Sequence, residues 1–502
     1  MENPKEPVLL TRNIKNIELQ ANSQKHTSSL MEKAGLEIAA HARALSVDKK
    51  KGTILILIGP GNNGVDALIA AFLLKSWWFD VTVFLPLGRK PKDLILTRKL
   101  NKWVQAGGKV IDDIESETDI NLVIDGIFGI GLNKIITGKL SSVIKQINKL
   151  ECNILSIDIP SGIDSDTGTV MGVAIKATYT VTFIGHKPGL YMNSGPDHAG
   201  IITIKKLGTE NLDPGPGHGY LISDRNIKSV IKKRDINSHK GMFGKVLVIG
   251  GAEGMYGAPI LTGRAAIKLG AGKVQIGILD KNIVVDFSQP DIMIDRAENL
   301  TKKITKDHII IIGPGLGKTK EALTCLERCI KSTAKLIMDA DALNLIAENK
   351  NLGKSLGLRK IPTVFTPHPA EAARLINEST AVIQRNRISA AKRISKQFSV
   401  TCVLKGCGTI ICDLNGMWHL NITGNPGMST SGMGDVLAGI IVALVAQNSS
   451  VLNAALAGCR LHGLAADALV CDGKGPIGLT ASETIDETRK ILNKILKEKI
   501  CR

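Results

Sequence analysis

Short, unbroken apolar segments recur along this 502-residue chain, and each is followed by a loop rich in glycine or acidic residues and then by a helical pattern. The first segment is TILILI (53–58), which leads into GPGNNGVD and the helical ALIAAFLLKSWW. Strands that are apolar on both faces must be covered on both faces, and strands that alternate with helices form parallel sheets of this kind. The pattern therefore predicts an α/β protein built from doubly wound, three-layer units.

The alternation of strands and helices stops once, in the segment DPGPGHGY (213–220), where proline and glycine crowd together. It restarts at KVLVIGG (245–251) and continues to a hairpin-like region at 400–424. The two halves share no repeat of fixed period. We therefore expect two tandem domains, residues 1–220 and 221–502.

Composition narrows the choice of partners. Lys and Arg number 64 against 46 Asp and Glu, a net charge of +18 that fits either a plain basic surface or anionic small substrates. Aromatic residues make up only 3%, which argues against platforms that stack nucleic-acid bases. Nine cysteines without a C-x-x-C pair indicate free thiols and a cytoplasmic protein. The only long apolar helical run expected, 436–446, is shorter than the ~20 residues of a membrane span. We expect small-molecule partners, no nucleic acid, no membrane and a homo-oligomeric assembly.

The first glycine-rich loop, GPGNNG (59–64), fits the G-x-G-x-x-G pattern of dinucleotide-binding sites. The acidic residue expected about 20 residues later is missing, because Leu85 and Pro86 stand there. The loop and the ends of two later strands carry oxygen-bearing side chains instead: Asn62, Asn63, Asp66, Asp125, Asp158 and Ser161. Ligands bind beyond the carboxyl ends of parallel strands, so these side chains can form one site for a hard cation and a polar substrate. The alternative is that each one only caps a helix or a turn.

Two further glycine-rich loops lie in the second half. GPGLGKT (313–319) misses the phosphate-binding loop pattern because position 312 is Ile, which leaves a glycine-lined approach to a ligand or a tight turn. GNPGMSTSGMGD (424–435) leads into an apolar helix, so its amides and the helix dipole predict an anion site. Asp435 would then take a proton from a hydroxyl during phosphoryl transfer, or act only as an N-cap.

Several of these motifs, in this order, resemble known families. GPGNNGVD, DGIFGIGL, DIPSGID and TFIGHKPGL resemble the NAD(P)H-hydrate epimerase domain. GKVLVIGG, GPGLG, TPHPAE, LKGCGT and GNPGMSTSGMGDVLAG resemble the ADP-dependent NAD(P)H-hydrate dehydratase, a ribokinase-like domain. The whole order is similar to that of bifunctional nicotinamide nucleotide repair proteins. It implies a Rossmann-like N-terminal and a ribokinase-like C-terminal domain.

The resemblance implies repair of NADH and NADPH after water has added to the nicotinamide ring. The first domain would interconvert the R and S hydrates, NADHX and NADPHX, with Asp158 as a catalytic residue and K⁺ on Asn63, Asp125 and Ser161. The hydrate would contact residues 62–66, residues 129–135 and Asp158. The two loops comprise Asn62, Asn63, Gly64, Val65, Asp66, Gly129, Ile130, Gly131, Leu132, Asn133, Lys134 and Ile135.

In the second domain, the resemblance implies dehydration of the S hydrate while ADP becomes AMP and phosphate, with Mg²⁺ on the diphosphate. Asp435 matches the catalytic base. Substrate contacts match Ala258, Gly315 and His368, and nucleotide contacts match Lys405, Gly406, Cys407, Gly408, Thr409 and Gly434. For two of these residues a role without ligand contact remains open: His368 would be a donor that fixes its loop, and Lys405 would be a solvated lysine at a strand end.

Three positions depart from the family pattern. Val65 and Ala67 stand where glycine is usual, and their added side chains would crowd the loop. Lys134 lies near a usual arginine, and a lysine cannot make the two-pronged contact of an arginine, so we expect a weakened epimerase. Two other functions stay open at this point. The N-terminal domain would be a non-catalytic binding module beside a working dehydratase, or the C-terminal domain would be an ATP-dependent kinase of a small alcohol.

Overall fold

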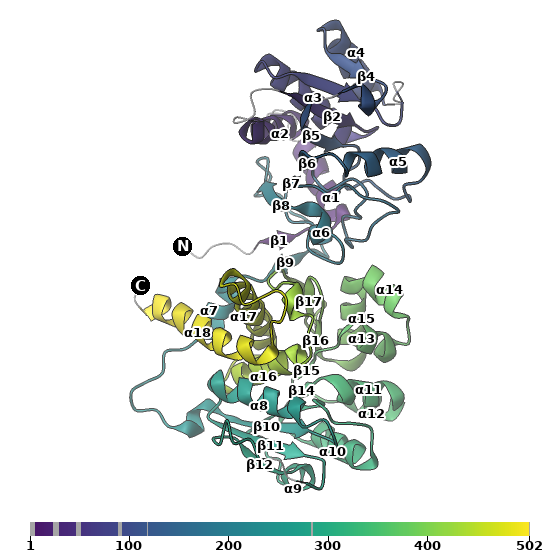
Figure 1. Ribbon diagram of the computed structural model, residues 1–502. Coiled ribbons are helices and arrows are strands. Elements are labelled where there is room, and N and C mark those ends of the chain that lie inside the picture. The colour runs from purple at the N-terminus through teal and green to yellow at the C-terminus, as the bar shows by residue number, and fades with distance from the viewer. Residues whose placement is uncertain are drawn as a thin grey trace. The chain divides into compact units, whose positions relative to one another are not determined.

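The computed structural model describes residues 6–23, 30–46, 52–88, 93–117, 119–282 and 285–500. The chain divides into two compact units, Met1–Gly219 and Tyr220–Arg502 (Figure 1). Each unit is built around its own sheet.

The sheet of the first unit is parallel throughout, and β2 lies between β3 and β5. Its strands in spatial order are β4 (Lys109–Ile111), β3 (Val81–Phe84), β2 (Thr53–Ile58), β5 (Ile120–Gly126), β6 (Asn153–Ile157), β7 (Tyr179–Phe183) and β8 (Ile201–Lys205). The strand order reverses between β2 and β5, and such a point leaves a crevice beyond the carboxyl ends of the two strands. The loops that begin at Gly59 and Ile127 border this crevice.

Helices cover both faces of this first sheet, which confirms the three-layer architecture expected from the apolar strands. Ile54, Ile56 and Ile58 pack into a core with residues of the helices on one face. Leu55 and Leu57 point to the opposite core, with α5 (Gly138–Ile147). The helices of the first face are α1 (Thr11–Ser23), α2 (Leu30–Ser46), α3 (Asn62–Ser76) and α4 (Leu94–Gln105). This unit also contains β1 (Pro7–Val8) and α6 (Pro196–Ala199).

The second sheet is parallel except at β16, β17 and β18, which pair in antiparallel fashion and confirm the hairpin region expected at 400–424. Its strands in spatial order are β9 (Gly219–Leu221), β18 (Trp418–Asn421), β17 (Thr409–Cys412), β16 (Thr401–Leu404), β15 (Thr363–Phe365), β14 (Lys335–Met338), β13 (His308–Ile312), β10 (Lys245–Gly250), β11 (Lys273–Ile278) and β12 (Met293–Arg296). The carboxyl ends of β13, β14, β15 and β16 therefore meet at one edge.

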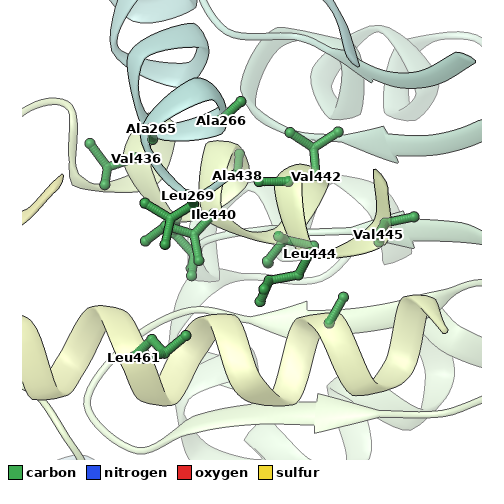
Figure 2. Close-up of a cluster of buried hydrophobic side chains, with 14 of the residues drawn as sticks. Ala265, Ala266, Leu269, Val436, Ala438, Ile440, Val442, Leu444, Val445 and Leu461 are labelled. Atoms are coloured by element: carbon green, nitrogen blue, oxygen red, sulfur yellow. The ribbon is translucent and has the colours of Figure 1, made fainter. Parts of the chain in front are cut away.

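Helices also cover both faces of the second sheet (Figure 1). One face carries α8 (Gly257–Lys268), α16 (Met433–Ala446), α17 (Val451–Cys471) and α18 (Ala481–Ile500). The other carries α10 (Lys320–Lys331), α11 (Ala340–Glu348), α12 (Lys350–Gly357), α13 (Pro369–Ile376) and α15 (Arg387–Phe398). Shorter helices are α7 (Asp224–Val230), α9 (Ala297–Thr301) and α14 (Thr380–Arg385). Figure 2 shows α16 packed between Ala265 of α8 and Leu461 of α17.

The expectation that 436–446 is the only long apolar helical run is wrong. Helix α17 has 21 residues and is long and apolar enough to cross a membrane, the one such helix among the described residues. However, 67% of its apolar window is buried inside the fold, where it packs against α16 and α18. A helix that is apolar on all sides is typical of a buried core position. The small residues of α17, such as Ala454, Ala457 and Gly458, allow this close packing.

Candidate active sites

A cavity of about 430 Å³ lies at the carboxyl ends of the strands in the first unit. It is lined by residues that follow β2, β5 and β6 and by residues of α1. The expected site residues along its wall are Asn62, Asn63, Asp66, Gly129, Ile130, Gly131, Leu132 and Asp158. The fold thus brings polar side chains from three separate strand ends to the wall of one cavity.

Other expected contacts lie elsewhere. Asn133, Lys134 and Ile135 are exposed and do not line the cavity. Gly64 is packed so closely that an added Cβ would lie 2.0 Å from the carbonyl oxygen of Gly59. Val65 belongs to the hydrophobic core under α3.

Ala67, the other position where glycine was expected, lies in the same core as Val65. The two side chains therefore do not narrow the cavity, and the expected crowding of the loop does not occur.

A buried carboxylate, Asp125, lies at the end of β5 and is fully enclosed. Its oxygens accept hydrogen bonds from Ser161 Oγ at 2.6 Å, Ser161 N at 2.9 Å and Ser156 Oγ at 2.8 Å. Burial raises the pKa of Asp125 above its usual value, although these hydrogen bonds oppose the shift. Asn63 donates to the carbonyl of Ile157 at 3.1 Å, and its Oδ1 lies 3.1 Å from a Cβ built at Gly129. The three oxygen-bearing residues thus gather around the loop that follows β5.

Asp158 forms an ion pair with a buried lysine that the sequence analysis missed. Lys187 Nζ lies 2.6 Å from Asp158 Oδ1, and the lysine side chain is 0% exposed. The ammonium also donates to Thr182 Oγ1 at 2.7 Å and to the carbonyl of Phe183 at 2.9 Å. The Asp158 backbone has a φ of +68°, a conformation that Asp and Asn tolerate better than most residues. Asp158 is therefore held at the cavity wall, and the buried ammonium of Lys187 balances its negative charge.

Asp66 faces the same cavity in a different environment. It is buried, and its Oδ1 has no hydrogen-bond partner. Burial, with Asp158 and Glu18 as neighbouring carboxylates, raises the pKa of Asp66 well above its usual value, against a smaller opposite effect of Lys99. Burial and Asp158 also raise the pKa of Glu18, which lines the cavity from α1. The cavity therefore holds carboxyl groups in two environments: Asp158 is ion-paired, whereas Asp66 and Glu18 have raised pKa values.

Replacing Asp66 with asparagine is expected to stabilise the protein by about 1–3 kcal/mol at pH 8 and to change little at pH 4. The folded state raises the pKa of Asp66, so the folded protein holds this proton more tightly than the unfolded chain does. Stability is therefore lost as pH rises from the unfolded pKa towards the folded one. Urea unfolding at both pH values, with K⁺ present, measures the difference. A variant that is less stable than the wild type at pH 8 would contradict this assignment.

In the second unit, Asp435 lies in the first turn of α16, directly after the glycine-rich segment 424–434. Gly432 enters the helix with a φ of +86°, which glycine adopts without strain. The start of the segment is tied to α17, because Asp467 accepts from Gly424 N and from Asn425 Nδ2, both at 2.9 Å. Burial, followed by the nearby Asp339, raises the pKa of Asp435 to about 7, although Lys405 opposes the shift.

Lys405, at the end of β16, forms an ion pair with Asp339, at the end of β14. Lys405 Nζ lies 2.7 Å from Asp339 Oδ1, and a Cβ built at Gly434 would lie 3.3 Å from the same Nζ. Burial disfavours the ammonium charge, but Asp339 and Glu371 together raise the pKa of Lys405. Lys405 is thus a paired, partly buried cation beside the Asp435 helix, and not a solvated lysine.

His368 is the N-cap of α13. Its Nδ1 accepts from Ala370 N at 3.1 Å and from Glu371 N at 3.4 Å, while Glu371 Oε2 accepts from His368 N at 2.8 Å. Its Nε2 lies 3.3 Å from Glu371 Oε1. Burial, with Lys405 nearby, lowers the pKa of His368. The ring therefore fixes its loop as an acceptor, while nearly half of its side chain stays exposed.

The remaining expected residues lie in the first turn of α8, after β13 and in the loop after β16. Thr262 Oγ1 donates to the carbonyls of Ala258 at 3.0 Å and of Asp435 at 3.1 Å, so the first turn of α8 is tied to Asp435. Gly315 has a φ of +56°, and an added Cβ would lie 2.5 Å from the carbonyl oxygen of Met255. In the 405–409 loop, Gly406 and Cys407 are exposed, and Gly406 N donates to Thr409 Oγ1 at 3.3 Å.

Comparisons with known proteins cover both units. Residues 27–189 match the family model described as YjeF-related protein N-terminus, and residues 246–489 match the model described as NAD(P)H-hydrate dehydratase. The chain is 34% identical over 452 residues to the bifunctional NAD(P)H-hydrate repair enzyme Nnr of Escherichia coli (strain K12), covering 89% of this chain and 86% of that protein.

Two further proteins are similar to this chain. The enzyme of that name from Moorella thermoacetica is 32% identical over 499 residues, covering 93% of each chain. A crystal structure of the ADP/ATP-dependent NAD(P)H-hydrate dehydratase from Bacillus subtilis, co-crystallised with ATP and Mg²⁺, is 27% identical. It covers 55% of this chain and 98% of that one, with a TM-score of 0.47.

Proposed function

The chain belongs to the bifunctional NAD(P)H-hydrate repair enzymes, and from this premise we propose which of its residues carry the two reactions. The first unit is the epimerase, and the second is the dehydratase. Similarity that spans both units does not favour a non-catalytic first domain or a small-alcohol kinase. The observation that carries the assignment of residues is the presence, in each unit, of a carboxyl group with a raised pKa at the carboxyl end of the sheet.

In the epimerase unit, we infer that Asp158 and Asp66 act as a base and an acid. Water adds to the enamine bond of the dihydronicotinamide ring, so the hydroxyl sits on the carbon next to the ring nitrogen. Inversion then requires the C–O bond to break and to form again on the other face. A protonated carboxyl can give a proton to the departing hydroxyl, and a carboxylate can take one from the entering water. The support is that one cavity holds an ion-paired carboxylate and a carboxyl of raised pKa.

The hydrate would lie against Asn62, Asn63 and residues 129–132, which line the cavity. The cavity is partly open to solvent, and a dinucleotide is long enough to reach beyond it. Its outer part would therefore extend over the exposed residues 133–135, as the family pattern predicts.

We propose that Asn63, Asp125 and Ser161 hold K⁺. The support is the chemistry of the donors: an amide oxygen, a carboxylate and a hydroxyl are the hard oxygen ligands that alkali and alkaline-earth cations prefer. A cation there would offset the burial that raises the pKa of Asp125. When bound, the ion would supply positive charge beneath the loop that follows β5.

In the dehydratase unit, we propose that Asp435 takes the proton of the ring hydroxyl while this oxygen attacks the β-phosphorus of ADP. AMP leaves, and the phosphate ester then loses phosphate and a proton from the neighbouring carbon, which restores the double bond. Gly434 and residues 405–409 would bind the nucleotide, and Ala258, Gly315 and His368 the hydrate. The support is a carboxyl with a pKa of about 7 beside a paired lysine at a helix N-terminus.

Mg²⁺ would be carried mainly by the phosphates of the nucleotide, as is usual for this ion. Among the described residues there is no group of three or more His, Cys, Asp or Glu side chains that could hold a metal. The ion would supply positive charge to the moving phosphoryl group.

We further propose that the enzyme works in the cytoplasm on small molecules alone and forms a homo-oligomer. The support for the compartment is that the described cysteines are free thiols. Size-exclusion chromatography with light scattering tests the oligomeric state, and a monomer at micromolar concentration would contradict it.

The test of the function uses separated R and S hydrates of NADH, incubated with the protein, ADP and Mg²⁺, with and without K⁺. We expect the reduced-nicotinamide absorbance to return from both hydrates, with one AMP formed for each NADH. We expect K⁺ to accelerate recovery from the R hydrate more than from the S hydrate. Recovery from the S hydrate only would contradict the epimerase, and no recovery from either would contradict both activities.

A further inference from the structure

Arg387, the first residue of α15, is a buried cation beneath the 405–409 loop. It is 2% exposed, and no carboxylate in the described part of the chain pairs with it. Its Nη2 donates to the carbonyls of Leu404 and Lys405 at 3.3 Å and of Gly408 at 3.2 Å. Its Nη1 donates to Gln384 Oε1 at 2.8 Å. One guanidinium thus holds both ends of the loop.

The positive charge of Arg387 lacks a full balance within the protein. Its Nε is buried and has no hydrogen-bond partner. Burial lowers the pKa of the guanidinium to about 10. A buried charge costs free energy unless an opposite charge offsets it, and carbonyl dipoles do this only in part. The folded protein therefore keeps a positive charge directly under a loop whose outer residues are exposed.

The same hydrogen bonds fix the position of Lys405. In a trans peptide, the carbonyl and the N–H point in opposite directions. The carbonyl of Leu404 points to Arg387, so the N–H of Lys405 points the other way and donates to the carbonyl of Pro367 at 2.9 Å. Lys405 Nζ then reaches Asp339 at 2.7 Å. Arg387 is thereby linked, through the backbone, to the ion pair next to Asp435.

Gly406 is fitted to the guanidinium. Its φ is +140°, and a Cβ added there would lie 2.7 Å from Arg387 Nη1. A side chain at position 406 would therefore strain the backbone and displace the arginine. The glycine allows the loop to close over the buried charge.

We propose that Arg387 is a positioning residue for the nucleotide: it holds the 405–409 loop in the shape that binds ADP, and the phosphates of ADP balance its buried charge. The arginine does not touch the nucleotide; it acts through the loop backbone. This proposal rests on the proposed nucleotide site and assigns to it a residue outside the loop.

The test compares Arg387→Met and Arg387→Lys in the full-length enzyme with the S hydrate as substrate. We expect Arg387→Met to raise the KM for ADP about 10- to 100-fold, with a much smaller change in kcat, because hydrogen bonds to a charged group are lost. Arg387→Lys keeps the charge, but its three N–H donors and single nitrogen cannot serve all four acceptors of the guanidinium, so we expect an intermediate KM. Calorimetry with ADP and Mg²⁺ should show the same order of affinity.

Arg359 provides a matched control, because it also binds backbone carbonyls but lies outside the nucleotide loop. Its Nη1 donates to Ile330 O at 2.6 Å and to Ser332 O at 2.5 Å. We expect Arg359→Met to lower the melting temperature without changing the KM for ADP. If Arg387→Met behaves in the same way, the proposal is overturned.

If Arg387→Met does not fold, Arg387→Lys and Gly406→Ala carry the test, and a wild-type KM for ADP in both overturns the proposal. If the wild-type enzyme does not convert ADP to AMP with the S hydrate, the proposed function fails. Calorimetry with ADP and Mg²⁺ then still tests Arg387: equal affinity of the wild type and Arg387→Met overturns the proposal, and weaker binding by the variant supports it.

Discussion

Asp435→Asn is expected to lower the kcat for dehydration of the S hydrate by about 10²- to 10⁴-fold, the usual contribution of a positioned general base. Asparagine fills the same space in the first turn of α16 but cannot accept the proton of the hydroxyl. The measurement is the return of reduced-nicotinamide absorbance at saturating ADP and Mg²⁺. Because the epimerase lies in the other unit, interconversion of the R and S hydrates should be unchanged.

The pH profile gives a second sign of the same role. Burial and Asp339 raise the pKa of Asp435 to about 7, and a base must be ionised to act. The kcat/KM of the wild type for the S hydrate should therefore rise with pH and level off above the pKa. Asp472→Asn, at an exposed position after α17, is the matched control and should behave as the wild type. Full activity of Asp435→Asn would contradict the proposed base.

Lys187→Met is expected to destabilise the protein by about 3–5 kcal/mol and to abolish recovery from the R hydrate, while recovery from the S hydrate continues. Removing one partner of a buried ion pair leaves the other charge without compensation, which is the reason for a cost of this size. Lys187 is 0% exposed and lies 2.6 Å from Asp158. Urea unfolding gives the stability, and the separated hydrates give the two activities.

The double variant Asp158→Asn/Lys187→Met separates folding from catalysis. It removes both charges, and asparagine suits the positive φ of position 158. We expect most of the lost stability to return, because replacement of a whole buried pair is far less costly than removal of one partner. Epimerase activity should stay absent. If the double variant recovers both, Asp158 is not a catalytic residue of the epimerase.

Much of the fold could be predicted from apolar patterns. TILILI became β2, and the region at 400–424 became the antiparallel strands β16, β17 and β18. The strand-end rule also located polar side chains that the structure brings together, such as Asp125 and Ser161. Applied once more, to KLIMDADAL, it would have found Asp339, which follows β14 and pairs with Lys405.

Three other residues of the two sites could not be located from a local sequence pattern. Lys187 follows the apolar segment TFIGH and reads as an ordinary exposed lysine, yet it is fully buried. Glu18 occupies one turn of an amphipathic helix and reaches the cavity only because α1 packs beside it. Arg387 stands 17 residues before the first carbonyl that it holds, that of Leu404. Nothing in a local pattern states that such groups will meet.

The sequence by itself determined where strands, helices and glycine-lined loops lie, because apolar periodicity and glycine act over a few neighbouring residues. It also placed carboxylates such as Asp158 and Asp435 at the ends of elements. Only the tertiary structure decided which buried charges share a site: Lys187 with Asp158, and Arg387 with the 405–409 loop. The physical reason is that burial and distance set the protonation of a carboxyl or the cost of a cation, and both arise only when distant segments pack together.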